Sequence, residues 1–384
     1  MTNLLHFYFV AGTGLEPVTS GLWARRATNC SIPRYNGTAK VRAIFKKTTI
    51  FAKKIFFLST PSPSGTCRGA RCINTKTMTI EDKEVYNNPN HRAGFISIVG
   101  KPNVGKSTLM NVLVGEKLSI ITSKAQTTRH RIMGILNGVH EETEFQLVYS
   151  DTPGIIKPQY KLHESMMEFV KGSLEDADIV LFVTDIFEKH DESEVLEQLS
   201  RTEGALILVI NKIDLATEEQ VQEKIAYWKE KLFTAAIVTV SALQQEGIDK
   251  LFTAIMEYLP IHPPYFPKDE LTDKPERFFA SEIIREKVFL NYKKEVPYST
   301  EVMIEEFKEK KEIIVIRAVI LVERASQKGI IIGDKGAMLK KIGTQAREDM
   351  EQFFGKKVFL EQYVKVEPDW RNKIQRLKQF GYDN

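Results

Sequence analysis

The feature that most constrains this chain is an apolar segment that leads directly into a glycine-rich loop. The residues are Ser97-Ile98-Val99-Gly100-Lys101-Pro102-Asn103-Val104-Gly105-Lys106-Ser107-Thr108. Residues 95–99 predict a buried strand, and residues 107–113 predict a helix. A strand, a G-x-x-x-x-G-K-S loop and a helix form the unit whose backbone N–H groups surround the phosphates of a nucleotide. The segment therefore predicts an α/β nucleotide-binding domain.

The loop also supplies two side chains with distinct chemistry. The Lys106 ammonium can reach the β- and γ-phosphates, and the Ser107 hydroxyl can bind Mg²⁺. The two glycines let the backbone curl around an anion, because no Cβ blocks its approach. We expect the whole loop to contact the nucleotide, and its residues are Gly100, Lys101, Pro102, Asn103, Val104, Gly105, Lys106, Ser107 and Thr108.

Four later segments repeat one plan, in which an apolar run is followed by a polar loop. The apolar runs cover residues 145–149, 179–183, 205–210 and 236–240. Helical stretches at 194–201 and 218–232 lie between them, so the order of elements predicts a mainly parallel sheet with helices on both faces. Ligands of such sheets bind at the carboxyl ends of the strands, where all four polar loops fall.

The base is predicted by Asn211-Lys212-Ile213-Asp214. A buried Asp214 carboxylate can accept hydrogen bonds from N1–H and the exocyclic amino group of guanine, and adenine offers neither donor. At about 1.5–3 kcal/mol per charge-assisted bond, the pair favours guanine by on the order of a hundredfold or more. The Lys212 stem can lie against the base, and the loop Ser241-Ala242-Leu243 offers a backbone N–H to the guanine carbonyl. We therefore predict GTP and GDP as the nucleotides.

The loop Asp151-Thr152-Pro153-Gly154-Ile155 follows the strand at 145–149. We expect Asp151 to hold Mg²⁺ through water and the Gly154 N–H to approach the γ-phosphate. Ras-type GTPases have a glutamine at the position of Ile155, where it orients the attacking water. Because isoleucine cannot hydrogen-bond water, we expect slow hydrolysis or a water molecule that another group holds.

A switch segment is predicted at Gln126-Thr127-Thr128-Arg129-His130. Such a segment needs a hydroxyl that reaches Mg²⁺ and the γ-phosphate only in the triphosphate state. Thr128 is the first choice and Thr127 the second, which gives Ser107, Thr128 and Asp151 as the magnesium ligands. We expect Lys106, Thr128 and Gly154 to be the catalytic residues. Arg129 and His130 are either functional or ordinary surface residues.

A domain boundary is predicted at residues 260–267, which contain four prolines in eight residues. We therefore divide the chain into a basic extension (1–77), a G domain (92–260), a proline-rich linker (261–274) and a C-terminal domain with its tail (275–384). His262 is expected to be a plain linker residue.

The C-terminal domain shows a helix, two strands, two helices and a strand, in that order. The loop Gly333-Asp334-Lys335-Gly336 between its helices has the G-x-x-G form of KH domains, which contacts the backbone of about four nucleotides. A tight interhelical turn is the alternative. Residues 325–384 hold 12 Lys/Arg and 8 Asp/Glu, whereas residues 78–324 hold 30 and 41, so positive charge gathers where RNA would bind. We predict a type II α+β KH domain with RNA contacts at Ile332, Gly333, Asp334, Lys335, Gly336 and Lys340.

The extension at residues 1–77 differs in composition from the rest of the chain. It holds 12 Lys/Arg against one acidic residue, Glu16, and all three cysteines, so we expect no disulfide in the two domains. Three interpretations stay open: an organelle transit peptide, a basic arm that binds RNA or a membrane, or a segment outside the real product, with translation starting at Met78. We favour the third, because residues 14–30 resemble the translation of a transfer-RNA gene, and we predict disorder there.

Taken together, residues 92–384 resemble the Era family of bacterial GTPases. The resemblance rests on the phosphate loop, the switch segment, Asp151–Ile155, Asn211–Asp214, the G-x-x-G loop with its preceding isoleucines and the ending Val364-Lys365-Val366-Glu367-Pro368-Asp369-Trp370-Arg371. Members of that family also carry an apolar residue at the position of Ile155.

The resemblance implies a monomeric ribosome-assembly factor. Such a protein binds the single-stranded 3′ end of 16S ribosomal RNA through its KH domain and acts in maturation of the small (30S) subunit. It would lie in the cytoplasm and loosely at the inner membrane. Two alternatives stay open: a GTP-gated regulator of another RNA or protein in which hydrolysis is incidental, and an organellar homologue with a transit peptide.

Overall fold

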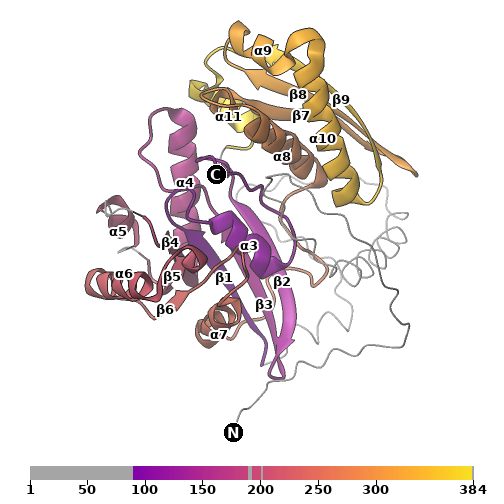
Figure 1. Cartoon of the computed structure of the whole chain (residues 1–384). Coiled ribbons are helices and arrows are strands. Elements are labelled where there is room, and N and C mark those ends of the chain that lie inside the picture. Colours follow the sequence, from indigo (N-terminus) through magenta and orange to yellow (C-terminus); the bar gives the residue numbers. More distant parts are fainter. Residues whose placement is uncertain (1–89, 189–192, 200–201, 383–384) are drawn as a thin grey trace, which may run out of the picture. The chain divides into compact units, whose positions relative to one another are not determined.

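The computed structural model describes residues 90–188, 193–199 and 202–382, which all belong to one compact unit, Cys72–Asn384. The predictions for residues 1–77 lie outside the described residues and stay predictions. The described part of the chain forms two sheets with their helices (Figure 1).

The first sheet is six-stranded, in the order β2-β3-β1-β4-β5-β6. Its strands are β1 (Arg92–Val99), β2 (Ile132–His140), β3 (Thr143–Asp151), β4 (Ile179–Asp185), β5 (Ala205–Asn211) and β6 (Ala236–Thr239). Only β2 runs antiparallel to its neighbour. The mainly parallel sheet predicted from the strand-and-loop pattern is therefore confirmed.

Helices cover both faces of this sheet, which explains why its central strands are apolar throughout. The helices are α3 (Lys106–Val114), α4 (Lys161–Glu175), α5 (Ser193–Leu199), α6 (Glu218–Lys231) and α7 (Ile248–Tyr258). In β4, Leu181 and Val183 pack in one core with α3 and α7, whereas Val180 and Phe182 pack in the other with α4, α5 and α6. Successive side chains of a strand point to opposite faces, so both must be apolar when both are covered.

Strand β2 was not predicted. Two glycines, Gly134 and Gly138, interrupt its apolar pattern, and glycine is unfavourable in strands. The structure gives the reason for the first one: a Cβ at Gly134 would lie 2.8 Å from Met110 and 2.8 Å from Val114 of α3. Close packing of α3 on the sheet requires a glycine there.

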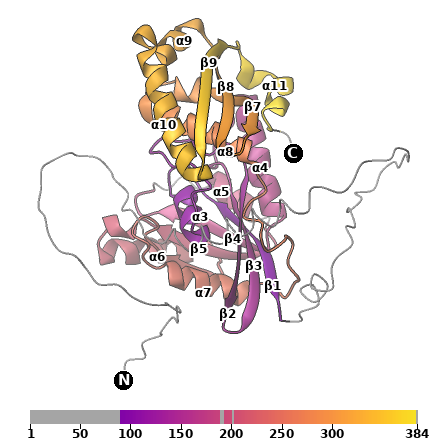
Figure 2. The same cartoon turned by 90° about the vertical axis from the view of Figure 1, so that its right-hand side faces the viewer.

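The second sheet has three strands, β7 (Glu301–Glu309), β8 (Ile313–Val322) and β9 (Lys357–Val366). Strand β7 is antiparallel to β8, and β9 is parallel to it. The helices α8 (Glu276–Asn291), α9 (Ala325–Ile332) and α10 (Ala337–Phe354) lie beside this sheet (Figure 2), and their apolar residues form one core with those of the strands. This α-β-β-α-α-β order is the predicted KH arrangement.

Two segments outside the sheets, the proline-rich linker and the C-terminal segment after β9, lie against the G domain. Directly before the proline-rich linker, the Pro260 carbonyl accepts from the Ala93 N–H at 3.2 Å, and within the linker the Leu271 carbonyl accepts from the Ile135 N–H at 2.8 Å. The His262 ring stacks on Tyr265. After β9 come a 3₁₀ turn (Trp370–Asn372) and α11 (Ile374–Gln379), and their apolar residues form a small core with α4.

Candidate functional site

The phosphate loop joins β1 to α3, and its backbone can be built only with glycine at two positions. Gly100 has φ 149° and Gly105 has φ 102°. A Cβ would lie 2.1 Å from the Val183 carbonyl oxygen at Gly100 and 2.2 Å from Asn211 Nδ2 at Gly105. Lys106 crosses the loop, since its Nζ donates to the carbonyls of Gly100 at 3.0 Å and Lys101 at 2.9 Å. The ammonium therefore lies inside the loop, where the phosphates of a nucleotide would bind.

The environment of Lys106 lowers its pKa to about 8. Burial is the main cause, and the negative charges of Asp151 and Glu188 act in the opposite direction. An ammonium that burial has destabilised gains more from an incoming anion than an exposed one does.

This lowered pKa predicts a pH dependence of nucleotide binding. Bound phosphate oxygens favour the ammonium and raise the Lys106 pKa above its value in the free protein. Binding should then take up close to one proton at about pH 9 and little at about pH 7, and affinity should fall by up to about tenfold per pH unit above about pH 8. Calorimetric titration in buffers of different ionisation enthalpy measures the proton count. Equal counts at the two pH values would contradict the assignment.

The three expected magnesium ligands lie together. Ser107 Oγ donates to Asp151 Oδ2 at 2.7 Å and lies 2.8 Å from Thr128 Oγ1. Asp151 is fully buried, its other oxygen has no hydrogen-bond partner, and burial raises the pKa of the carboxyl. An unpartnered buried carboxylate oxygen beside two hydroxyls fits a hard divalent cation such as Mg²⁺, which takes its remaining ligands from phosphate and water.

The geometry favours Thr128 over Thr127 as the switch hydroxyl. Thr127 Oγ1 donates to the Lys124 carbonyl at 2.7 Å, away from Ser107. Clusters of three or more His, Cys, Asp or Glu side chains that could hold a metal ion are absent from the described residues.

The loop after β3 lies directly on the phosphate loop. Thr152 Oγ1 donates to the Ile98 carbonyl at 2.8 Å, and the Ile155 N–H donates to the Gly100 carbonyl at 3.1 Å. A Cβ at Gly154 would lie 2.7 Å from Pro102, so this approach requires glycine. Pro153 is buried between these contacts. The Ile155 side chain packs in the core beside α4 and gives no hydrogen bond to water.

A pocket of about 380 Å³ opens beside these loops, lined by Lys101, Gln126, Ile155 and His163 among others. The Gln159 N–H donates to His163 Nδ1 at 3.3 Å, so Nε2 carries the proton and donates to Gln126 Oε1 at 3.1 Å. Burial, with the charges of Arg129 and Arg371, lowers the pKa of His163 to about 4, and the ring is neutral at physiological pH. The pair fixes the start of the switch segment.

The expected base-reading loops also lie together, and Asn211 and Lys212 connect them to neighbouring loops. Asn211 braces the site, because its Nδ2 donates to the Val104 carbonyl at 2.8 Å and its Oδ1 accepts from the Ala242 N–H at 3.0 Å. Lys212 Nζ donates to the Asn103 carbonyl and to Asp185, both at 2.7 Å. The neighbouring Leu243 is exposed.

Asp214 is exposed, whereas we expected it to be buried. Binding of a guanine base would remove its carboxylate from water. Ser241 Oγ donates to Asp214 Oδ1 at 2.6 Å and fixes the orientation of the carboxylate.

Arg129 and His130 are buried, so the surface alternative for them is wrong. Their partners come from the KH domain and were not found by sequence reasoning: Arg129 donates to Glu301, and His130 stacks on Tyr382 with ring centroids 4.1 Å apart. One available signal was the charged run 285–287, which stands between the apolar pairs 283–284 and 288–289 of one helix. Residues 282–289 of α8 are all buried, which a helix at the surface of an isolated domain would not show.

The G-x-x-G loop joins α9 to α10. Gly333 has φ 71°, Lys335 φ 46° and Gly336 φ 81°, and a Cβ at Gly333 would lie 2.7 Å from Met338. Asp334, Lys335 and Lys340 are exposed, and Ile332 is half-buried. The loop therefore offers backbone and charge at the surface. Helices long and apolar enough to span a membrane are not found among the described residues.

Known families and proteins match both domains. A family model for 50S ribosome-binding GTPases matches residues 95–212, and one for KH domains matches residues 295–371. The chain is 45% identical to the GTPase Era of Geotalea uraniireducens over 295 residues, which are 76% of this chain and 98% of that protein. It is also 45% identical to the GTPase Era of Clostridium kluyveri over 294 residues, 76% of this chain and 99% of that protein.

Two solved structures resemble the described fold. One is a crystal structure of Era with MgGDPNP and nucleotides 1506–1542 of 16S ribosomal RNA, with a TM-score of 0.73 and 41% identity over 77% of this chain and 100% of that chain. The other is an Aquifex aeolicus Era variant bound to GDP and AlF₄⁻, with a TM-score of 0.73 and 42% identity over 76% of this chain and 100% of that chain. The predicted combination of a G domain and a KH domain is confirmed.

Proposed function

This chain belongs to the Era family of GTPases, and from that membership we propose that it binds 16S ribosomal RNA and acts in assembly of the small ribosomal subunit. The observation that carries the proposal is a phosphate loop, a guanine-type loop and an exposed G-x-x-G loop in one chain. The similar Era structure holds MgGDPNP and a 16S ribosomal RNA segment together.

The chain is a GTPase that uses GTP and Mg²⁺. We assign Lys106 and the loop N–H groups to the phosphates, and Ser107, Thr128 and Asp151 to the metal, whose charge would balance the charge that develops on the phosphates. Ile155 contributes no hydrogen bond to the attacking water, so hydrolysis is expected to be slow until RNA or the subunit is bound.

We assign the exposed loop at Gly333–Gly336, with Ile332 and Lys340, to the RNA backbone. Positive φ angles at three of its residues turn the backbone outward, and Lys335 and Lys340 add charge that neutralises phosphate. We place the protein in the cytoplasm, because its proposed target is the assembling small subunit. That it acts as a monomer stays a prediction of the family resemblance. Loose contact with the inner membrane stays a prediction of the family resemblance.

Hydrolysis in the presence of the target tests the proposal. We expect small ribosomal subunits, or an oligonucleotide of the 16S 3′ end, to accelerate single-turnover GTP hydrolysis. Binding of that oligonucleotide should be tighter with a GTP analogue than with GDP, by linkage between the two sites. An absence of both effects would favour a regulator that acts on another RNA or on a protein.

Replacing Gly333 and Gly336 by aspartate should weaken RNA binding by at least about tenfold. Two negative charges would face phosphate, and a side chain at φ 71° and 81° is strained. Filter binding of the 3′-end oligonucleotide at physiological salt measures the loss. GTP affinity should stay unchanged and shows that the G domain is intact, and Gly355→Asp, at the open C-terminus of α10, is the control for strain alone. RNA affinity that survives the double change would contradict the KH assignment.

A further inference from the structure

The KH domain encloses the side chain of Arg129, the residue after the expected magnesium ligand Thr128. Its Nη1 donates to the Thr300 carbonyl at 2.8 Å and to Glu301 at 3.0 Å, and its Nη2 donates to the carbonyls of Pro297 and Tyr298 at 3.2 and 3.1 Å. The side chain is 1% exposed. Among the described residues, Glu301 is the only carboxylate in an ion pair with it. A buried guanidinium that loses such a partner is strongly destabilised.

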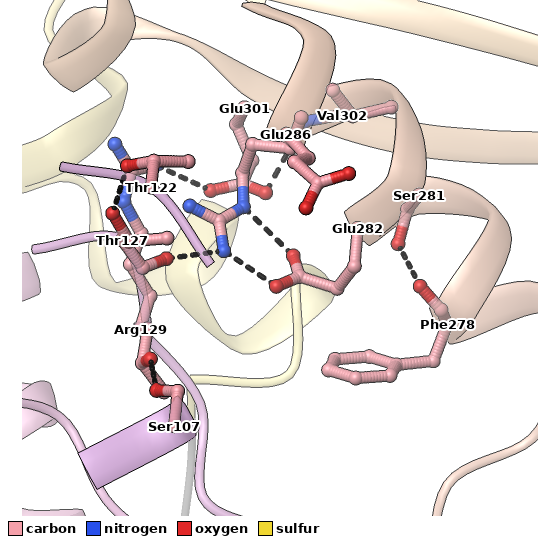
Figure 3. Close-up of polar contacts among 12 residues, drawn as sticks. Ser107, Thr122, Thr127, Arg129, Phe278, Ser281, Glu282, Glu286, Glu301 and Val302 are labelled. Carbon is pink, nitrogen blue, oxygen red and sulfur yellow. Dashed lines mark hydrogen bonds and ion pairs between the residues drawn. The ribbon is translucent and has the colours of Figure 1, made fainter. Parts of the chain in front are cut away.

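The residue before Thr128 is held by the same domain. Arg285 of α8 is fully buried, and its Nη2 donates to the Thr127 carbonyl at 2.6 Å. Glu282, one turn earlier on α8, accepts from Arg285 and fixes its orientation. Figure 3 shows Thr127 and Arg129 facing Glu282 and Glu301. The KH domain thus holds the chain on both sides of Thr128.

Thr128 itself points the other way, into the G domain. Its hydroxyl lies 2.8 Å from Ser107 Oγ, which donates to Asp151. Thr127 and Arg129 are therefore hydrogen-bonded to the KH domain, whereas Thr128 between them contacts the metal site. A shift at Arg129 or Thr127 would move Thr128 with it, because one peptide unit separates each pair.

Glu301 is in turn held rigidly at the start of β7. Tyr382 OH donates to its Oε2 at 2.8 Å, and its Oε1 accepts from the Val302 N–H at 3.2 Å. Tyr382 also stacks on His130, so the C-terminal segment contacts the switch and its partner together. A preorganised acceptor of this kind fixes geometry as well as charge.

We propose that Glu301 is a positioning residue for the magnesium site of the G domain, acting through Arg129 to hold the Thr128 hydroxyl against Ser107 and Asp151. The inference rests on the proposed function in one respect, the use of Thr128 as a ligand in the triphosphate state. Because Thr128 serves only that state, docking of the KH domain favours Mg²⁺·GTP over GDP, and by reciprocity GTP favours docking.

The test uses the full chain with Glu301→Gln, which keeps an acceptor for Arg129 but removes its charge. We expect affinity for a fluorescent GTP analogue with Mg²⁺ to fall about tenfold, the difference between a charge-assisted and a neutral hydrogen bond. GDP affinity should change by less than about twofold. Without nucleotide, amides of residues 122–130 should exchange hydrogen faster in the variant. Tyr382→Phe, which removes one hydroxyl, should shift both measurements less and in the same direction.

Glu361→Gln is the matched control, because Glu361 is an exposed β9 residue paired with Arg317 on the sheet. A general loosening of the KH domain would also raise exchange in β7 and β8 and weaken RNA binding, which a positioning role does not. If Glu301→Gln fails to fold, Arg129→Lys, which cannot reach all four acceptors, replaces it. The Glu301→Gln effect should vanish in an Arg129→Ala background.

An unchanged preference for the GTP analogue over GDP in Glu301→Gln, with unchanged exchange at 122–130, would overturn the inference. An effect that persists in the Arg129→Ala background would also overturn it. A wild-type chain without a Mg²⁺-dependent preference for the GTP analogue would instead contradict the part of the proposed function that assigns Thr128 to the metal in the triphosphate state.

Discussion

Replacing Lys106 by alanine is expected to reduce GTP affinity by on the order of a hundredfold to a few thousandfold, because truncation of a buried charged partner costs about 3–5 kcal/mol. The Lys106 ammonium lies inside the phosphate loop, is 6% exposed, and donates to two loop carbonyls. The substitution removes the one lysine of the loop whose ammonium the structure places inside the loop. Equilibrium binding of a fluorescent GTP analogue measures the change.

The loss should come from the site and not from the fold. In the variant, the carbonyls of Gly100 and Lys101 lose a donor but can reach water, so we expect only a small change in the free energy of unfolding. Lys171→Ala is the control, because Lys171 is an exposed residue of α4 that pairs weakly with Glu175 at 3.7 Å. Wild-type nucleotide affinity in Lys106→Ala would contradict the phosphate-loop assignment.

The sequence alone predicted those parts of the structure that local pattern determines. Strand β8 (Ile313–Val322) is one of the two strands predicted before the G-x-x-G loop, and it was predictable because it is a β-branched run on a sheet face that helices cover. The loops at Gly100, Asp151, Asn211 and Ser241 meet at one sheet edge because parallel strands place their carboxyl ends together. These inferences needed only periodicity and one rule of sheet topology.

What the sequence could not predict depends on pairs that lie far apart along the chain. Arg129 and Glu301 are separated by 172 residues, and three of the four acceptors of Arg129 are backbone carbonyls, which leave no trace in residue identity. Strand β2 was missed because Gly134 serves the packing of α3 and Gly138 lies against the Phe145 ring of β3. Both failures have one cause: tertiary contact decided the residue type.

Replacing Asp214 by asparagine is expected to lower GTP affinity by on the order of a hundredfold and to raise affinity for xanthosine triphosphate. Guanine donates two hydrogen bonds to the carboxylate, at about 1.5–3 kcal/mol each, and an amide can accept only one of them. Xanthine carries an oxygen in place of the amino group and can accept from the amide. Competition binding with the two nucleotides measures the switch, and Asp269→Asn, in the exposed part of the linker, is the control.

The hydrogen bond between Ser241 and residue 214 decides how completely the Asp214→Asn variant changes its preference from guanine to xanthine. Because Ser241 Oγ donates to Asp214 Oδ1 at 2.6 Å, the asparagine oxygen takes that position and its amide nitrogen takes the place of Oδ2. The amide is then held with its donor toward the base. In the double variant Asp214→Asn, Ser241→Ala the amide can turn over, so its preference for xanthosine should be weaker than in Asp214→Asn. Full guanine selectivity in Asp214→Asn would mean that another group reads the base, since an amide held this way cannot accept both guanine donors.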